Sequence, residues 1–384
     1  MHKKSELLTV ILFCVVIASV SLLFVILPDK TFSQQENRDL AMFPELTKES
    51  FFSGEFAKQL NVYFADQFPF RNQLVKLHAA TEQLFLKGSN NGVLYDHNQL
   101  AVYEFNSYHS FLEITPDTDR LYLDTIQLQL DALDRLGQNL DVPLVTVLPP
   151  RTIDVTDQIY SYDRPDGDVA FEMMRDTLKK NAGYIDALSL LREKHQDGEY
   201  VIYRTDHHWT TLGAYYLYCE IMKELGKSDR IIPQEEFEIS QISGFSGTTA
   251  AKGTFPFYEP DVLEIWRLSD EGEYEITIDG ELFDGFYSER FLQESDKYSV
   301  FLDGTHNVTL IKKPGQQRET LVIAKDSFAN CLIPFLAREY DIVALNLRTN
   351  TALSFAVEYY SAAAVLVVYN MENIMTSADL ANVK

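Results

Sequence analysis

Cysteine and basic residues are scarce in this sequence. Of its 384 residues, three are cysteine and 33 are lysine or arginine, whereas 57 are aspartate or glutamate, which gives a formal net charge of −24 at pH 7. Two cysteines, Cys219 and Cys331, lie outside the apolar N-terminal run, so the chain cannot form a disulfide framework or a structural zinc cluster. The deficit of positive charge argues against nucleic acid as a partner and against docking on anionic lipid through a basic patch.

Charge is absent from one long stretch near the N-terminus. Residues Leu7 to Leu27 are uncharged, and the run is about long enough to cross the hydrocarbon core of a bilayer as a helix. Lys3 and Lys4 precede it, so the positive-inside rule predicts a cytoplasmic N-terminus and an extracytoplasmic remainder. The run does not end in the small-residue site of a cleavable signal peptide. We therefore expect residues 1–29 to be an uncleaved anchor in the lipid bilayer, with cleavage as the alternative.

The rest of the chain can bury a core, since 46% of the sequence is hydrophobic. Residues 30–50 are polar and predict a stalk, and residues 51–384 predict one extracytoplasmic domain. From about residue 142 apolar strands alternate with helices, which indicates an α/β domain with a mainly parallel sheet flanked by helices. One predicted strand covers residues 200–206. Between about 232 and 310 short strands and turns predict a β-rich insertion.

One serine stands where α/β sheets place their ligands. In "LVIAKDSFAN" an apolar strand runs into Asp326 and Ser327 immediately before a predicted helix. The carboxyl end of a parallel strand is the ligand-binding edge of such sheets, and free N–H groups at a helix N-terminus stabilise an oxyanion. Helix capping is the alternative interpretation, because serine is a favoured N-cap residue.

The segment "YRTDHHWTT", residues 203–211, concentrates rare side chains. The chain has eight histidines and two tryptophans, yet an acid, two histidines and an indole follow one another here. A serine nucleophile needs a base, and the base needs an orienting acid. We expect His208 and Asp206 to supply them on the same edge of the sheet as Ser327. His207, between them, is expected to point elsewhere.

A metal site and an accidental surface loop are the two other interpretations of this cluster. A metal site requires further ligands at workable spacing, and the remaining histidines form no HxxxH or CxxC arrangement with the cluster, so we expect no metal and no cofactor. An accidental surface loop is disfavoured by Tyr203 and Trp209, because exposed indoles are uncommon without packing or ligand contact. Their aromatic faces suit a sugar ring as well as a core.

"YRTDHHWTTLGAYYLY" resembles the signature of the DHHW protein family. "ENRDLAMFPELT", "YFADQFPFRNQLVKL" and "LVIAKDSFANCLIPFLAREYDIVALNLR" resemble other segments of that family, and the matching segments keep the family order over most of the exported chain. The family is similar to the periplasmic alginate O-acetyltransferases. The resemblance implies a circularly permuted, flavodoxin-like SGNH-hydrolase fold.

Carried over to this sequence, the resemblance implies that Ser327 is the nucleophile, His208 the general base and Asp206 its orienting acid. The order Asp, His, Ser reverses that of ordinary SGNH hydrolases, as a permuted sheet requires. The spacing Asp-x-His is shorter than the usual Asp-x-x-His. The resemblance further implies an extracytoplasmic O-acetyltransferase or acetylesterase acting on a cell-surface polysaccharide, with a membrane-bound O-acyltransferase as partner.

Some roles and two rival functions stay open at this point. Gly244 and Gly247 in "GFSGT" are candidates for the second oxyanion donor. Arg151 follows the predicted strand 142–150 and is a candidate substrate-binding residue, with a solvated arginine as the alternative. The rival functions are a non-catalytic polysaccharide-binding or assembly component and a general esterase or lipase.

Overall fold

The computed structural model describes residues 2–33, 38–96, 99–102, 116–156, 168–178, 183–270, 273–349 and 352–383. The chain forms two compact units. The N-terminal unit comprises Met1–Asn90 with Thr254–Phe257, and the α/β unit comprises Asn91–Gly253 with Tyr258–Lys384.

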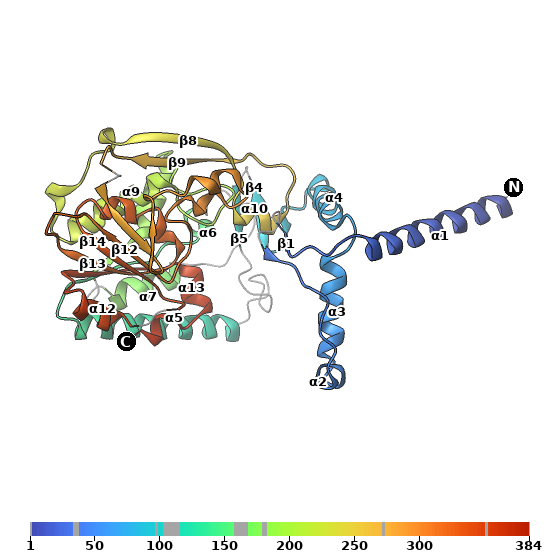
Figure 1. The fold of residues 1–384 in the computed structure, drawn as a ribbon, viewed down its shortest axis with the longest axis horizontal. Helices are drawn as coiled ribbons and strands as arrows, with labels where there is room; N and C mark the ends of the chain where they lie inside the picture. Colours follow the sequence, from blue (N-terminus) through green and yellow to red (C-terminus); the bar gives the residue numbers. More distant parts are fainter. Residues whose placement is uncertain are drawn as a thin grey trace. The chain divides into compact units, whose positions relative to one another are not determined.

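The N-terminal unit begins with the long helix α1 (His2–Ile26; Figure 1). Its Ser5–Ile26 portion has a mean hydropathy of 3.0, and by length and composition it can cross a membrane. The remaining elements of this unit are short: β1 (Phe32–Ser33), β2 (Arg38–Asp39), α2 (Lys48–Phe52), α3 (Glu55–Asp66), α4 (Arg71–Leu84) and β3 (Ser89–Asn90).

The expected stalk and domain boundary differ from the structure. Within residues 30–50, β1 pairs with β2, and the Gln67 side chain at the end of α3 donates to the carbonyls of Lys30 and Ala41, both at 2.9 Å. The segment therefore packs with the helices that follow it, and residues up to Asn90 belong with the anchor instead of with the α/β domain.

The α/β unit is built on an eight-stranded mixed sheet in the order β11-β10-β12-β14-β13-β15-β6-β7. Strands β14, β13, β15, β6 and β7 pair in parallel, and β12, β10 and β11 extend one edge in antiparallel fashion. The strands are β6 (Leu144–Val147), β7 (Tyr184–Ile185), β10 (Glu275–Ile278), β11 (Glu281–Phe283), β12 (Val308–Lys312), β13 (Thr320–Lys325), β14 (Asp341–Asn346) and β15 (Ala364–Val368).

Helices cover both faces of this sheet. In Figure 1, α5, α7, α12 and α13 lie on one side and α9 lies on the other. The central strands β13, β15 and β6 are buried along nearly their whole length, which explains their continuous apolar sequences. The helices are α5 (Pro116–Asn139), α6 (Thr152–Val155), α7 (Asp168–Leu178), α8 (Ala187–Gln196), α9 (Thr211–Glu224), α10 (Thr248–Gly253), α11 (Ile333–Leu336), α12 (Leu353–Tyr359) and α13 (Met371–Thr376).

The expected β-rich insertion is not a separate body. Strands β10, β11 and β12 join the main sheet, while β8 (Glu238–Phe245) and β9 (Asp261–Arg267) form an antiparallel ribbon. A hairpin of β4 (Val93–Asp96) and β5 (Gln99–Val102) completes the strands. Short 3₁₀ helices occur at Ser228–Arg230, Gln234–Glu236, Glu289–Gln293, Lys297–Val300, Ser327–Asn330 and Leu380–Asn382.

The predicted strand at residues 200–206 is absent. Ile202 and Trp209 form an isolated bridge, and the backbone N–H of Thr210 donates to the carbonyl of Val201 at 2.9 Å. The segment is therefore a tight loop closed on itself. Its apolar residues follow a pattern typical of a strand because they are buried, but their backbone–backbone hydrogen bonds form within the loop.

Candidate active site

Ser327 opens a 3₁₀ turn directly after the central strand β13. Asp326 caps this turn, because its carboxylate accepts from the backbone N–H of Phe328 at 3.0 Å. The same carboxylate accepts from the backbone and side-chain nitrogens of Asn370 at 2.7 and 2.6 Å and from the Asn373 side chain at 3.1 Å. Burial raises the pKa of Asp326, and these amide donors oppose that rise. The turn that presents Ser327 is thus tied to the residues that follow β15.

The loop that carries Asp206 and His208 is held by a second buried carboxylate. Asp261, the first residue of β9, accepts from the backbone N–H groups of Arg204 and Thr205 at 3.0 and 2.8 Å and from the Thr205 hydroxyl at 2.6 Å. Three donors on one carboxylate fix the loop backbone immediately before Asp206.

The structure brings Asp206, His208 and Ser327 together. His208 Nε2 lies 2.8 Å from Ser327 Oγ, and His208 Nδ1 lies 2.6 Å from Asp206 Oδ1. Asp206 and His208 are 1% and 4% exposed. The two ring nitrogens of one imidazole therefore bridge an acid and a hydroxyl, which is the geometry of a nucleophile, its base and an orienting acid.

Asp206 is held in its charged form. Burial alone raises the pKa of this carboxyl, but the neighbouring His208 and His207 and the backbone N–H of Thr248 lower it well below its usual value. The ionised carboxylate favours a proton on His208 Nδ1, so that Nε2 faces the Ser327 hydroxyl as an acceptor.

Two aromatic rings set the plane of His208. Tyr298 stacks on it with ring centroids 3.7 Å apart and an interplanar angle of 7°, and Phe328 lies 4.7 Å away. The Tyr298 hydroxyl donates to Cys331 Sγ at 3.1 Å. Burial raises the pKa of the Cys331 thiol to about 12, so this cysteine stays protonated. Sequence analysis missed Tyr298, because it lies in an irregular segment without a motif.

The two aromatic residues flanking the histidines are not available to a sugar. Tyr203 and Trp209 are fully buried, which corrects the expectation that their faces could bind substrate. Tyr203 packs edge-on against Phe245 and Tyr298. The Trp209 indole donates to the carbonyl of Phe328 at 3.1 Å, and so it links the histidine loop to the serine turn.

The two candidate oxyanion glycines have other roles. The N–H of Gly247 donates to the Thr205 hydroxyl at 3.1 Å, and a Cβ at this position would lie 2.3 Å from the Asp206 carboxylate. Gly247 is therefore needed for the close approach of Asp206. Gly244 has a φ of +76° beside the irregularity that separates Ser243 from Phe245 in β8, and it does not line the cavity at Ser327.

Arg151 also differs from the expectation. Its side chain is buried, and its Nε donates to Asp154 Oδ2 at 2.6 Å. The guanidinium forms an internal ion pair after β6, so the structure supports neither a solvated arginine nor one free to bind substrate.

Ser327 opens on a polar cavity of about 390 Å³. Several of its lining residues lie at the carboxyl ends of parallel strands: Asn346 is the last residue of β14, Arg348 follows β14, and Asn370 follows β15. Sequence analysis missed these residues, although the rule that located Ser327 applies to them as well. The complete lining is Val102, His207, Thr248, Thr249, Lys252, Thr305, Asp326, Ser327, Asn346, Arg348, Asn370, Glu372 and Asn373.

His207 faces this cavity, partly contrary to the expectation that it points away from the site. Its Nδ1 lies 2.6 Å from the Thr248 hydroxyl, and that hydroxyl donates to Asp206 Oδ2 at 3.0 Å. Because the hydroxyl has one proton and the carboxylate is the stronger acceptor, we assign the His207 proton to Nδ1. Burial lowers the pKa of His207, so its Nε2 is an unprotonated acceptor.

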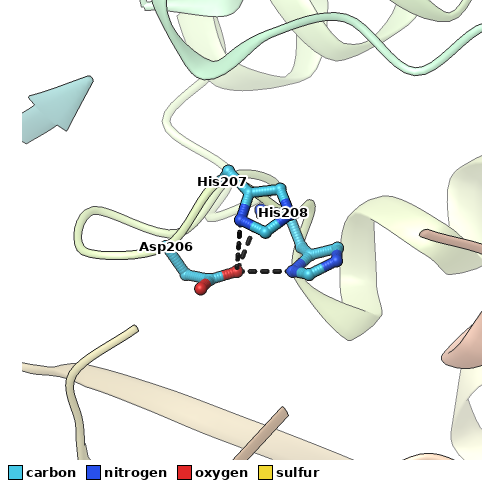
Figure 2. A group of neighbouring side chains, drawn as sticks. All are labelled: Asp206, His207 and His208. Atoms are coloured by element: carbon cyan, nitrogen blue, oxygen red, sulfur yellow. Dashed lines mark hydrogen bonds and ion pairs between the residues drawn. The ribbon is translucent and has the colours of Figure 1, made fainter. Parts of the chain in front are cut away.

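Asp206, His207 and His208 could also be considered as metal ligands, since one ligand atom from each lies within 4.8 Å of the others (Figure 2). The 2.6 Å separation of Asp206 Oδ1 and His208 Nδ1 is a hydrogen-bond distance. Ligands on a tetrahedral zinc ion, with bonds of about 2.0–2.2 Å, are roughly 3.3–3.6 Å apart. The arrangement therefore favours a hydrogen-bonded acid–base pair.

A family model described as DHHW protein matches residues 144–345, more than half of the sequence. The comparison with curated proteins gives no match.

Among solved structures, a DHHW family protein from Eubacterium siraeum has 19% identity and a TM-score of 0.57, covering 76% of this chain and 96% of that chain. Bacillus cereus PatB1 has 18% identity and a TM-score of 0.59, covering 76% and 99%. The O-acetyltransferase domain of Pseudomonas putida AlgJ has 14% identity and a TM-score of 0.47, covering 76% and 95%. At these identities the first two similarities show a shared α/β fold.

The role of Gly247 is testable by Gly247→Ala. The new Cβ must displace the Asp206 carboxylate, so we expect the rate at which a fluorophosphonate labels Ser327 to fall about 100-fold, as for a misplacement of about 1 Å. Overpacking should lower the free energy of unfolding by roughly 1–3 kcal/mol. Ser243→Ala, an exposed change in β8 four residues before Gly247, is the control. Unchanged labelling in Gly247→Ala would contradict the proposed role.

Proposed function

This chain belongs to the DHHW protein family, and we propose that it is a membrane-anchored, extracytoplasmic carbohydrate O-acetyltransferase or acetylesterase that works through a serine acyl-enzyme. The observation that carries the proposal is the hydrogen-bonded series Asp206–His208–Ser327, which ends at a polar cavity. Because Ser327 follows His208 in the chain, we further propose that the fold is circularly permuted relative to ordinary SGNH hydrolases.

In the first half of the proposed reaction, Ser327 Oγ attacks the carbonyl carbon of an acetyl donor while His208 Nε2 takes the hydroxyl proton. The tetrahedral intermediate collapses, and His208 returns the proton to the leaving group, which departs from an acetylated Ser327. In the second half, an acceptor hydroxyl attacks the acetyl carbonyl and gives its proton to His208. The second tetrahedral intermediate collapses, the bond between the acetyl carbon and Ser327 Oγ breaks, and His208 returns the proton to that oxygen. A sugar acceptor gives transfer, and water gives hydrolysis.

Two donors fit the oxyanion of these intermediates. We propose the backbone N–H of Ser327 and the side-chain amide of Asn346. Asn346 ends β14, in register with Lys325 at the end of β13, and its Oδ1 accepts from the backbone N–H of Arg348 at 3.1 Å. In the described part of the chain, neither the Ser327 N–H nor Asn346 Nδ2 has a hydrogen-bond partner. Both groups lie at the cavity.

The cavity lining supports a carbohydrate as acceptor. Asparagine, threonine, arginine and glutamate side chains surround Ser327, and of the lining residues only Val102 is apolar. Such a surface hydrogen-bonds sugar hydroxyls and offers little to a long acyl chain, which disfavours a lipase. The acidity of the protein favours neutral or amino sugars over strongly anionic polymers.

The remaining parts of the proposal concern the membrane. Helix α1 anchors the chain with its N-terminus in the cytoplasm, and a membrane-bound O-acyltransferase supplies the acetyl group. Support comes from the length and apolarity of α1 and from Lys3 and Lys4 before its uncharged portion.

The central test is covalent trapping of the nucleophile in the full-length chain. A sulfonyl fluoride is a suited reagent, since the similar B. cereus PatB1 has been described with a sulfonyl adduct. We expect one adduct, mapped by peptide mass to Ser327, and turnover of p-nitrophenyl acetate. Ser327→Ala and His208→Ala should lower kcat by at least about 10³-fold, while Ser228→Ala, an exposed serine, should not. Saccharide binding by a folded chain without adduct or turnover would favour the non-catalytic, polysaccharide-binding function.

The oxyanion assignment predicts a separate effect of Asn346→Ala. Loss of one such donor lowers kcat by about 10²–10³-fold, and we expect little change in KM because the interaction forms mainly in the transition state. Asn307→Ala, an exposed asparagine immediately before the neighbouring strand β12, is the matched control. Steady-state kinetics with p-nitrophenyl acetate decide the point, and equal kcat for the two variants would remove Asn346 from the mechanism.

His207 is proposed to orient the acceptor. In the described part of the chain its Nε2 has no hydrogen-bond partner, so it can accept from a sugar hydroxyl beside the acetylated serine. His207→Phe should reduce the ratio of acetyl transfer to hydrolysis by roughly tenfold, the value of one hydrogen bond, and leave sulfonyl labelling of Ser327 intact. His207→Gln, whose amide oxygen can accept, should restore part of the ratio. An unchanged ratio in both variants would exclude this role.

A further inference from the structure

The N-terminal unit exposes apolar side chains in a way that the α/β unit does not. Beyond α1, most of the exposed large apolar residues of the described chain lie in residues 32–86. Among the described residues of the much larger α/β unit few are exposed: Leu128, Ile239, Leu282, Phe355 and Tyr359. Soluble surfaces rarely gather large apolar side chains in this way, so the N-terminal unit has an interaction surface.

Helix α4 and its N-cap carry the clearest part of this surface. Phe70, Leu74, Leu77 and Leu84 follow a spacing of four, three and seven residues, which places them on one side of the helix. We call these four residues the α4 stripe. They are 58%, 47%, 63% and 74% exposed, whereas Ala79 is fully buried. The helix therefore turns its larger apolar side chains outward and packs with a small one.

The surface is tied to the end of the membrane helix. Phe24, in the last turn of α1, contacts the rings of Tyr63 and Phe64 of α3 at 5.9 and 5.3 Å. The Tyr63 hydroxyl donates to Asp29 at 3.1 Å, immediately after α1. Helix α3 is thus fixed where the chain leaves the apolar span.

The first residue of α4 is tied to the end of α3. Arg71 Nε lies 3.7 Å from Asp66 Oδ1, and Asp66 also accepts from the backbone N–H of Ala41 at 2.9 Å. The α4 stripe therefore begins close to the point at which α1 ends. A partner that covers the stripe must be present at the surface of the membrane.

The charges of this segment fit a lipid surface. Residues 71–87 contain Arg71, Lys76 and Lys87 and one acid, Glu82, in a chain whose net charge is −24. Arg71 pairs with Asp66 and Lys87 with Glu82, and the described residues show no ion pair for Lys76. A helix with a local excess of basic residues and an apolar face lies in the bilayer interface, where its apolar side chains enter by about 5–10 Å and its cations meet lipid phosphates. The net charge of the whole chain does not reveal that basic residues outnumber acidic ones in this segment.

We propose that the α4 stripe binds the lipid bilayer, in the leaflet from which α1 emerges. The chain thereby has a second membrane contact besides its spanning helix. This inference rests on the anchoring role of α1 in the proposed function, but not on the chemistry at Ser327.

Tryptophan fluorescence offers a direct test in the full-length chain. The protein has two tryptophans, Trp209 and Trp266, and both are buried, so their emission is a constant background. Leu77→Trp places a reporter in the α4 stripe, and Leu128→Trp places one at a similarly exposed leucine of α5. Each variant is reconstituted into phosphatidylcholine–phosphatidylglycerol vesicles, with and without acyl chains brominated near the headgroup. Val16→Trp in α1, measured with acyl chains brominated near their methyl ends, reports insertion at the bilayer centre.

We expect bromolipid to quench the added emission of Leu77→Trp at least about twofold, as for a side chain at the headgroup–acyl boundary, and to leave that of Leu128→Trp unchanged. A quenched Val16→Trp with an unquenched Leu77→Trp would overturn the proposal and assign the stripe to a protein partner. Equal quenching at Leu77 and Leu128, or no quenching at Val16, would overturn it as well. Sulfonyl labelling of Ser327 in the same vesicles reports separately on the proposed chemistry.

Discussion

The contact between His208 Nε2 and Ser327 Oγ joins two segments that are 119 residues apart, and the site depends on it. A 2.8 Å contact between side chains from separate segments requires that both backbones be held. Asp261 holds the histidine loop from one side, and Asp326 holds the serine turn from the other. Trp209 connects the two directly through the carbonyl of Phe328. The indole thus aligns Ser327 with His208, and Trp209 does not line the cavity.

The site contains two buried carboxyl groups whose pKa values move in opposite directions. Burial raises the pKa of both Asp206 and Asp326. At Asp206 two imidazoles and a backbone N–H outweigh this effect, and the group stays charged. At Asp326 the partners are mainly neutral amides from Asn370, Asn373 and Phe328, which offset burial only in part. The imidazole neighbours therefore keep Asp206 ionised, whereas the amide neighbours of Asp326 leave its pKa raised.

The chain combines a polar cavity with an apolar surface on a different unit. The cavity presents asparagine, arginine and glutamate side chains to Ser327, as an acceptor rich in hydroxyl groups requires. The N-terminal unit presents leucine and phenylalanine beside a helix that can cross a membrane. The two surfaces follow from different compositions of neighbouring parts of one sequence.

The sequence by itself determined what depends on local spacing: the apolar helix α1, the strands β13, β14, β15 and β6, and the position of Ser327 after a parallel strand. It also singled out Asp206 and His208, because a serine nucleophile needs a base and an acid. Tertiary structure decided the rest. The sequence predicts a strand at residues 200–206, but the structure has a loop there. The apolar residues of this segment are buried in the core, and burial favours apolar side chains in a loop as well as in a strand.

The same limit explains the individual residues. Tyr203 and Trp209 could have faced a sugar or the core, and only packing shows that they are buried. The role of Gly247 depends on its contact with Asp206, which lies forty-one residues earlier in the chain. The role of Arg151 depends on its ion pair with Asp154, three residues later. The spacing of apolar residues along a sequence predicts whether a segment is a helix or a strand and which of its side chains share a face. The partner of each polar group is set by segments distant in sequence, because buried hydrogen bonds form wherever the folded chain brings a donor and an acceptor together.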